Sequence, residues 1–152
     1  MKLAPHFVHE LSQANGRFEE LTQIFRAFVG DLAHFKNIGY MVSGIEAKEI
    51  GDPLCFTVSY RSVLVSFRLI CGLSLSNKAS AHVLCTLEKP AYITEDRLLG
   101  SFSFNFQGIT DIEVSSGTGH AEIRYAAQDI VLHFLHLALA KGVTTLAVEP
   151  LP

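Results

Sequence analysis

The strictest pattern in this sequence is a row of nine apolar positions near the N-terminus that recur in alternating steps of four and three residues. They are Phe7, Leu11, Ala14, Phe18, Leu21, Phe25, Phe28, Leu32 and Phe35. Apolar residues at this spacing form one continuous stripe, here called the seam, along the side of a helix. The pattern predicts a long helix over residues 7–36, and this helix must bury its seam against the rest of the domain or against a second copy of the chain.

The expected length of this helix raises a question about its continuity. At 1.5 Å per residue it spans ~45 Å, whereas a compact domain of this size is only ~35–40 Å across. The helix therefore either projects beyond its domain or breaks, and Asn15-Gly16 is the place where a break is expected. The seam continues without a miss through Gly16, so both alternatives stay open. We expect Phe25, Phe28 and Phe35 to face the protein's own sheet, and the excess length to join two copies as a homodimer.

Between residues 38 and 115 the apolar period changes from 3.5 to two, which is typical of strands with one buried face. Alternating runs cover residues 54–60, 63–75, 81–87, 102–106 and 112–114. The alternation changes phase at Arg61-Ser62, which indicates a two-residue hairpin or a bulge. Short turns separate the runs, and strands joined by short turns pair antiparallel. The pattern predicts an antiparallel sheet of five or six strands, with Phe102, Phe104 and Phe106 on its buried face.

A second helix is expected over residues 120–140, after a turn rich in serine and glycine at 115–119. Its apolar side chains cover almost the whole circumference, and such a helix is buried on most sides. Lys141-Gly142 is a typical helix end, and residues 143–148 have the composition of a short final strand. The sequence thus predicts a single α+β domain over residues 1–152, with both helices on one face of a curved sheet.

Composition excludes some classes of protein. The net charge is −3, and the 12 Lys and Arg residues are dispersed, whereas nucleic-acid binding requires a basic surface. The apolar stretch at 130–140 contains His133 and His136 and falls short of the ~20 residues that a membrane span needs. No secretory signal is visible. Cys55, Cys71 and Cys85 lack metal-ligand spacing, which is typical of buried thiols in a reducing cytoplasm.

The turn at Gly117 and Gly119 is the most site-like segment. If a helix begins there, its free N–H groups and dipole could bind an anion. Thr118 would contribute to this site, and His120 and Glu122 could supply acid–base chemistry beside it. The competing interpretation is an ordinary turn and helix cap, which we favour.

Two further candidates for chemistry lie elsewhere. Arg68 falls on the polar face of a strand, where it is a ligand-binding candidate if that face is covered and an ordinary surface residue if it is not. His133 and His136 lie one helical turn apart and could ligate a metal, but a zinc site needs further ligands that the spacing does not provide. The sequence implies no cofactor.

Three functions remain compatible with these patterns. The first is a non-catalytic binding or assembly module that self-associates through apolar surface or binds a partner protein. The second is a domain that holds an apolar small molecule between sheet and helices. The third is a small enzyme using His120 and Glu122, which we consider less consistent with the residues.

Overall fold

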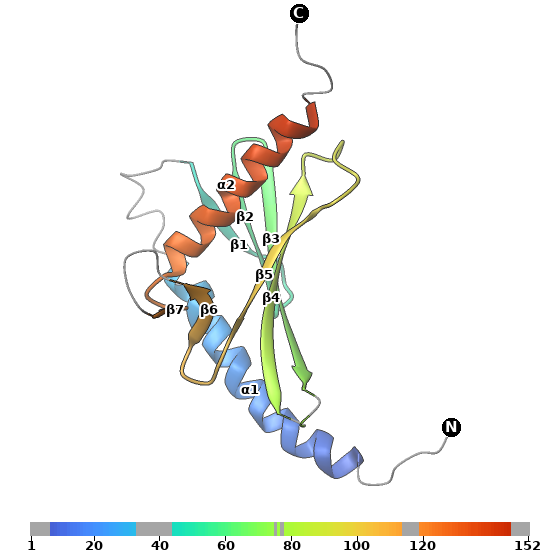
Figure 1. Ribbon diagram of the computed structural model, residues 1–152, viewed down its shortest axis with the longest axis vertical. Coiled ribbons are helices and arrows are strands. Elements are labelled where there is room, and N and C mark those ends of the chain that lie inside the picture. The colour runs from blue at the N-terminus through green and yellow to red at the C-terminus, as the bar shows by residue number, and fades with distance from the viewer. Residues whose placement is uncertain (1–6, 33–43, 75, 77, 114–118, 147–152) are drawn as a thin grey trace, which may run out of the picture.

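The computed structural model describes residues 7–32, 44–74, 76, 78–113 and 119–146. It has an N-terminal helix, an antiparallel sheet and a C-terminal helix, so the predicted α+β class is confirmed (Figure 1). The elements in chain order are α1 (Phe7–Leu32), β1 (Glu46–Glu49), β2 (Cys55–Tyr60), β3 (Val63–Leu73), β4 (Ala79–Lys89), β5 (Leu98–Phe104), β6 (Ile109–Glu113), β7 (His120–Glu122) and α2 (Ala127–Leu146).

The sheet has seven strands in sequential order, each antiparallel to the next. The expected count of five or six was low because β1 and β7 lack alternating apolar residues. Strand β1 is held by pairing with β2, where Ala47 lies opposite Val58. The predicted hairpin between β2 and β3 is confirmed: Tyr60 pairs with Val63, and Arg61 adopts a positive φ of 54° in the turn.

Helix α1 is continuous through Asn15-Gly16, so the alternative of a broken helix is wrong. A Cβ at Gly16 would meet nothing within 4 Å, which shows that the glycine lies on open surface. The N-terminal turns of α1 extend past the end of the β3–β4 hairpin (Figure 1). There Phe7 and Leu11 are 54% and 58% exposed, although the seam is buried at Leu21. The predicted end of the helix and the position of Phe35 lie outside the described residues.

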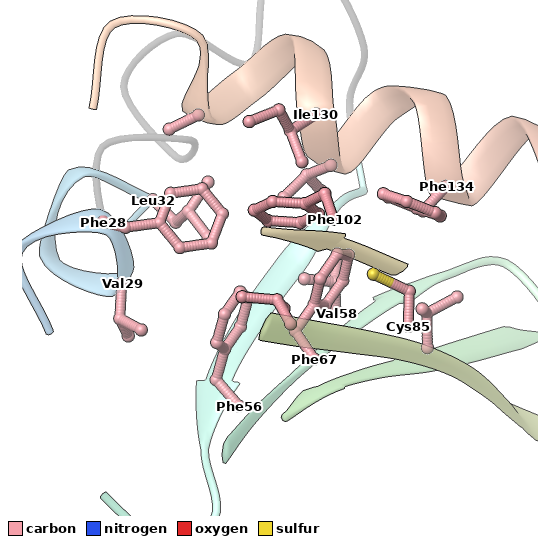
Figure 2. Packing of buried hydrophobic residues seen from close by; sticks show 14 of the residues in the cluster. Phe28, Val29, Leu32, Phe56, Val58, Phe67, Cys85, Phe102, Ile130 and Phe134 are labelled. Atoms are coloured by element: carbon pink, nitrogen blue, oxygen red, sulfur yellow. The ribbon is translucent and has the colours of Figure 1, made fainter. Parts of the chain in front are cut away.

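Aromatic rings from both helices meet on one face of the sheet, as predicted (Figure 2). Phe28 of α1 lies 5.6 Å from Phe56 of β2, measured between ring centroids. Phe56 stacks on Phe67 of β3 at 4.9 Å, and Phe67 in turn lies 5.8 Å from Phe134 of α2. Phe102 of β5 contacts both helices through Phe28 and Phe134. These rings form the centre of the core.

Of the three phenylalanines predicted on the buried face of one strand, two are buried in β5 and the third lies outside it. Phe102 and Phe104 are buried on the helix-facing side. Phe106 lies beyond the end of β5 and is half-buried, with the Arg17 guanidinium 5.6 Å from its ring centroid. The strand phase was therefore correct, and the strand ends earlier than the alternation suggested.

The prediction that a helix begins at His120 is wrong. Residues 120–122 form β7, in which His120 lies opposite Glu113 of β6. The Thr110 hydroxyl donates a 2.6 Å hydrogen bond to the Ala121 carbonyl and fastens β7 to β6. Helix α2 begins only at Ala127, because the intervening residues make the turn that leads the chain from the sheet to the helix layer.

The predicted final strand over residues 143–148 is also wrong. Helix α2 continues through Lys141-Gly142 to Leu146, and residues 147 and 148 lie outside the described part. A glycine inside a helix costs only about 1 kcal/mol, and the buried residues Phe134 and Ala138 hold the preceding turns against the sheet. Neither helix in the described part of the chain is long and apolar enough to cross a membrane.

Candidate functional site

A groove of ≈ 730 Å³ lies between α2 and the β5–β7 end of the sheet, and we call it the α2 groove. Its apolar part is formed by Leu99, Phe102, Ile112, Ile130, Phe134 and Leu137. Its polar part is formed by Glu113, His120, Glu122, Tyr125, Asp129 and His133. A concave site with an apolar lining and a few polar groups is the usual form of a small-molecule site.

Gly100 sets the distance between the sheet and α2 in this groove. It faces the helix layer opposite Cys85, next to an irregularity in the β4–β5 pairing. A Cβ at Gly100 would lie only 3.1 Å from Cε1 of Phe134. Any larger residue would push the Phe134 ring away, so glycine allows this ring to lie close against the strand. Phe134 is fixed further by Phe102, 6.2 Å away between centroids.

Two short strands and one helical face carry the polar residues of the groove. Glu113 and His120 are cross-strand neighbours on β6 and β7. Asp129 and His133 are four residues apart on α2, a spacing that places two side chains on the same helical face. The ring of His133 contacts Phe134 edge-on, 5.1 Å between centroids. The groove thus combines carboxylates and imidazoles at its rim with aromatic rings beneath them.

The structure brings together three of the residues that the sequence analysis singled out. His120, Glu122 and His133 all line the α2 groove, although they were predicted for two separate sites. His136, the expected partner of His133, is exposed and does not line it. In the described ranges no group of three or more His, Cys, Asp or Glu residues is arranged to hold a metal ion.

Both interpretations of the glycine turn, the anion site and the helix cap that we favoured, needed a helix N-terminus at His120. This residue lies in a strand. Gly117 and Thr118 lie outside the described residues. The first turn of α2 carries Asp129, whose negative charge disfavours an anion at that helix end.

Arg68 lies away from the groove, on the sheet face opposite to the two described helices. Its guanidinium forms a 2.9 Å ion pair with Asp52, and both side chains are partly exposed. The pKa of Asp52 is lowered first by the Leu54 N–H, which donates a 2.9 Å hydrogen bond to the carboxylate, and next by Arg68. Of the two interpretations of Arg68, the structure therefore favours the ordinary surface residue.

Tyr125 and Asp129 are groove residues that the sequence analysis missed. Tyr125 is 88% exposed, an unusual amount for a large aromatic side chain. The spacing of Asp129 and His133 was a usable signal, since it places two polar groups on one face of an otherwise apolar helix. Tyr125 had no such signal, because its position depends on the turn between β7 and α2.

Within the described part of the chain, no hydrogen bond or ion pair links the polar side chains of the α2 groove to one another. The arrangement can therefore hold a polar group of a ligand, but it shows no preassembled pair of nucleophile and base. Comparison of the chain with protein-family models, with curated proteins and with solved structures found no match.

Proposed function

We propose that this chain is a non-catalytic binding module that holds a small molecule with an apolar body in the α2 groove. One observation carries the proposal: the groove has an apolar floor built from buried aromatic and aliphatic side chains, with polar groups confined to its rim. Its volume of ≈ 730 Å³ falls within the range of roughly 300–1,000 Å³ typical of ligand pockets.

The apolar lining of the groove rests on the core. Phe102 is 2% exposed and Phe134 5% exposed, and both rings pack into the aromatic core. The half-buried Leu99, Ile112 and Leu137 line the same groove and provide the apolar surface that a ligand would cover. A ligand that covers an already packed surface does not have to order it first.

The test uses N-phenyl-1-naphthylamine, an uncharged probe that fluoresces when it leaves water. We expect saturable binding to the wild-type protein and its loss in Leu137→Trp, where the larger side chain fills the groove. Leu139→Trp is the matched control, because Leu139 is a half-buried leucine of the same helix that does not line the groove. Wild-type binding by a folded Leu137→Trp protein would contradict the proposal.

A second candidate function, assembly of two copies, is favoured by a different observation. The N-terminal turns of α1 expose Phe7, Val8 and Leu11 by 54%, 74% and 58%. Two of these residues continue the seam whose later positions are buried in the protein's own core. A second copy brings the same stripe, so two such helices can cover each other across a two-fold axis.

Sedimentation at micromolar protein tests this assembly. We expect the mass of a homodimer for the wild-type protein and of a monomer for Leu11→Glu. Gln13→Glu is the control, since Gln13 is also exposed but lies on the opposite side of the helix. A monomeric wild-type mass at all concentrations would refute the assembly function and leave the ligand-binding proposal standing.

A further inference from the structure

The rim of the α2 groove carries negative charge without a compensating cation. Glu113, Glu122 and Asp129 all line it, and none of the described residues around it is Lys or Arg. In the described part of the chain, the carboxylates of these three residues take part in no ion pair. This acidic rim lies directly above the apolar floor.

The arginine nearest in sequence is directed elsewhere. Arg124 lies between Glu122 and Tyr125, but its Nε is 3.2 Å from an oxygen of Asp31 on α1. Two other exposed carboxylates, those of Glu49 and Asp52, are likewise paired with arginines. The groove carboxylates differ from these, because the described chain leaves their charge available to a ligand.

Tyr125 adds a second feature suited to a cation. Its ring is 88% exposed at the rim of the groove, beside Glu122 and the first turn of α2. The face of an aromatic ring attracts ammonium groups, and quaternary ammonium ions are recognised in this way. An exposed tyrosine next to carboxylates therefore matches a cationic head group better than an anionic or neutral one.

We propose that the ligand of the α2 groove is an amphipathic cation, with an ammonium head group at the acidic rim and an apolar body over the half-buried Leu99, Ile112 and Leu137. This inference rests on the proposed ligand-binding function and specifies the chemical class of the ligand. The carboxylates supply charge complementarity, which selects among ligands more than it adds affinity. The apolar floor supplies the part of the affinity that all ligands with the same tail share.

The experiment compares three amphiphiles with one tail and different head groups: decyltrimethylammonium, decyl maltoside and decyl sulfate, each below its micelle concentration. Displacement of N-phenyl-1-naphthylamine reports their binding. We expect the cation to bind about tenfold more tightly than the other two at low salt. The preference should shrink as salt screens the rim.

Two double variants show whether the rim carboxylates cause this preference. Glu122→Gln/Asp129→Asn should remove it, so that decyltrimethylammonium no longer binds more tightly than decyl maltoside. Glu19→Gln/Glu20→Gln is the control, because it alters net charge equally at exposed positions of α1 and should keep the preference. Loss of the preference in this control would assign it to overall charge and overturn the inference.

The outcomes separate the two proposals. Equal binding of all three amphiphiles, abolished by Leu137→Trp, would refute the cationic ligand and retain the ligand-binding function. Tighter binding of decyl sulfate would refute the cationic ligand as well. Failure of the uncharged probe and of all three amphiphiles to bind would refute both proposals.

Discussion

Replacement of Leu21 by alanine probes how the seam of α1 is divided between buried and exposed positions. Leu21 is completely buried, and Leu11, ten residues earlier on the same seam, is 58% exposed. The same substitution at these two sites changes the same atoms in the same helix. Only the surroundings differ, so the difference in the free energy of unfolding measures burial.

The expected cost follows from the atoms removed. Leu21→Ala deletes three carbons, at ~0.8 kcal/mol each for transfer from water, or about 2.4 kcal/mol. The cavity left in the core adds to this, and measured Leu→Ala losses in a packed core run from about 2.7 to 5 kcal/mol. Leu21 borders a hollow of ≈ 470 Å³, so its neighbours are less tightly held than at the centre of the core and can move into the vacated space. We therefore expect a loss of about 3 kcal/mol, in the lower part of that range.

Urea unfolding followed by far-ultraviolet circular dichroism is the suitable assay, because the chain contains no tryptophan. In thermal unfolding followed by the same signal, Leu21→Ala should lower Tm by roughly 6–12 °C, at 2–4 °C for each kcal/mol. At protein concentrations low enough for a monomer, Leu11→Ala should cost less than about 1 kcal/mol. A loss below about 1 kcal/mol for Leu21→Ala would refute the packing described here. An equal loss at both sites, dependent on protein concentration, would show that Leu11 is buried in an assembly.

Three further predictions concern other parts of the molecule. Phe104→Ala should cost roughly 3–5 kcal/mol in the same assay; a loss under about 1 kcal/mol would contradict its burial. The ionised form of Asp52 stabilises the fold, because the Leu54 N–H lowers the pKa of its carboxyl group. This contribution is lost as pH falls through the lowered pKa. In a plot of the free energy of unfolding against pH, Asp52→Asn should therefore reduce the loss of stability at acid pH. Iodoacetamide should label half-buried Cys71 before Cys85, because burial raises the pKa of the Cys85 thiol. Mass spectrometry of the labelled native protein would measure this order. Labelling of Cys85 before Cys71 would contradict the burial of Cys85.

The parts of the fold that could be predicted from sequence are those with one buried and one open face. In β3, Val65, Phe67 and Leu69 are buried and alternate with Arg68 and Ile70, which are exposed. The alternation is visible because the two described helices cover the same side of the sheet. The seam of α1 is equally regular, and its positions from Leu21 to Leu32 are buried against that side.

The elements that were not predicted are held in place by contacts with other elements and carry no pattern of their own. Strand β1 contains Glu46, Lys48 and Glu49, and no apolar alternation marks it as a strand. Its pairing with β2 and the 3.0 Å ion pair between Glu49 and Arg26 of α1 keep it in the sheet. In α2 the local stop signal Lys141-Gly142 did not end the helix, because one glycine costs a helix only about 1 kcal/mol and the preceding turns are already packed at Phe134 and Ala138.

The candidate site was only partly accessible to sequence reasoning. His120, Glu122 and His133 stood out as polar groups in unusual surroundings, but nothing in the sequence showed that β7 and α2 would bring them to one groove. That arrangement depends on the turn after β7 and on Gly100, which lets α2 approach the strand. Both are features of the three-dimensional packing, and neither produces a regular spacing of apolar residues in the sequence.

The two ends of the described sheet differ in how easily a further strand could be added. An unpaired edge strand offers its backbone groups to any other strand, and long apolar edges therefore promote aggregation. One edge is β1, only four residues long and three of them charged, so it gives an incoming strand little length and little apolar surface. At the other end β6 pairs with β5 only at Phe104 and Thr110. Among the described residues, the preceding part of β5 is therefore the place where an added strand would find free backbone groups.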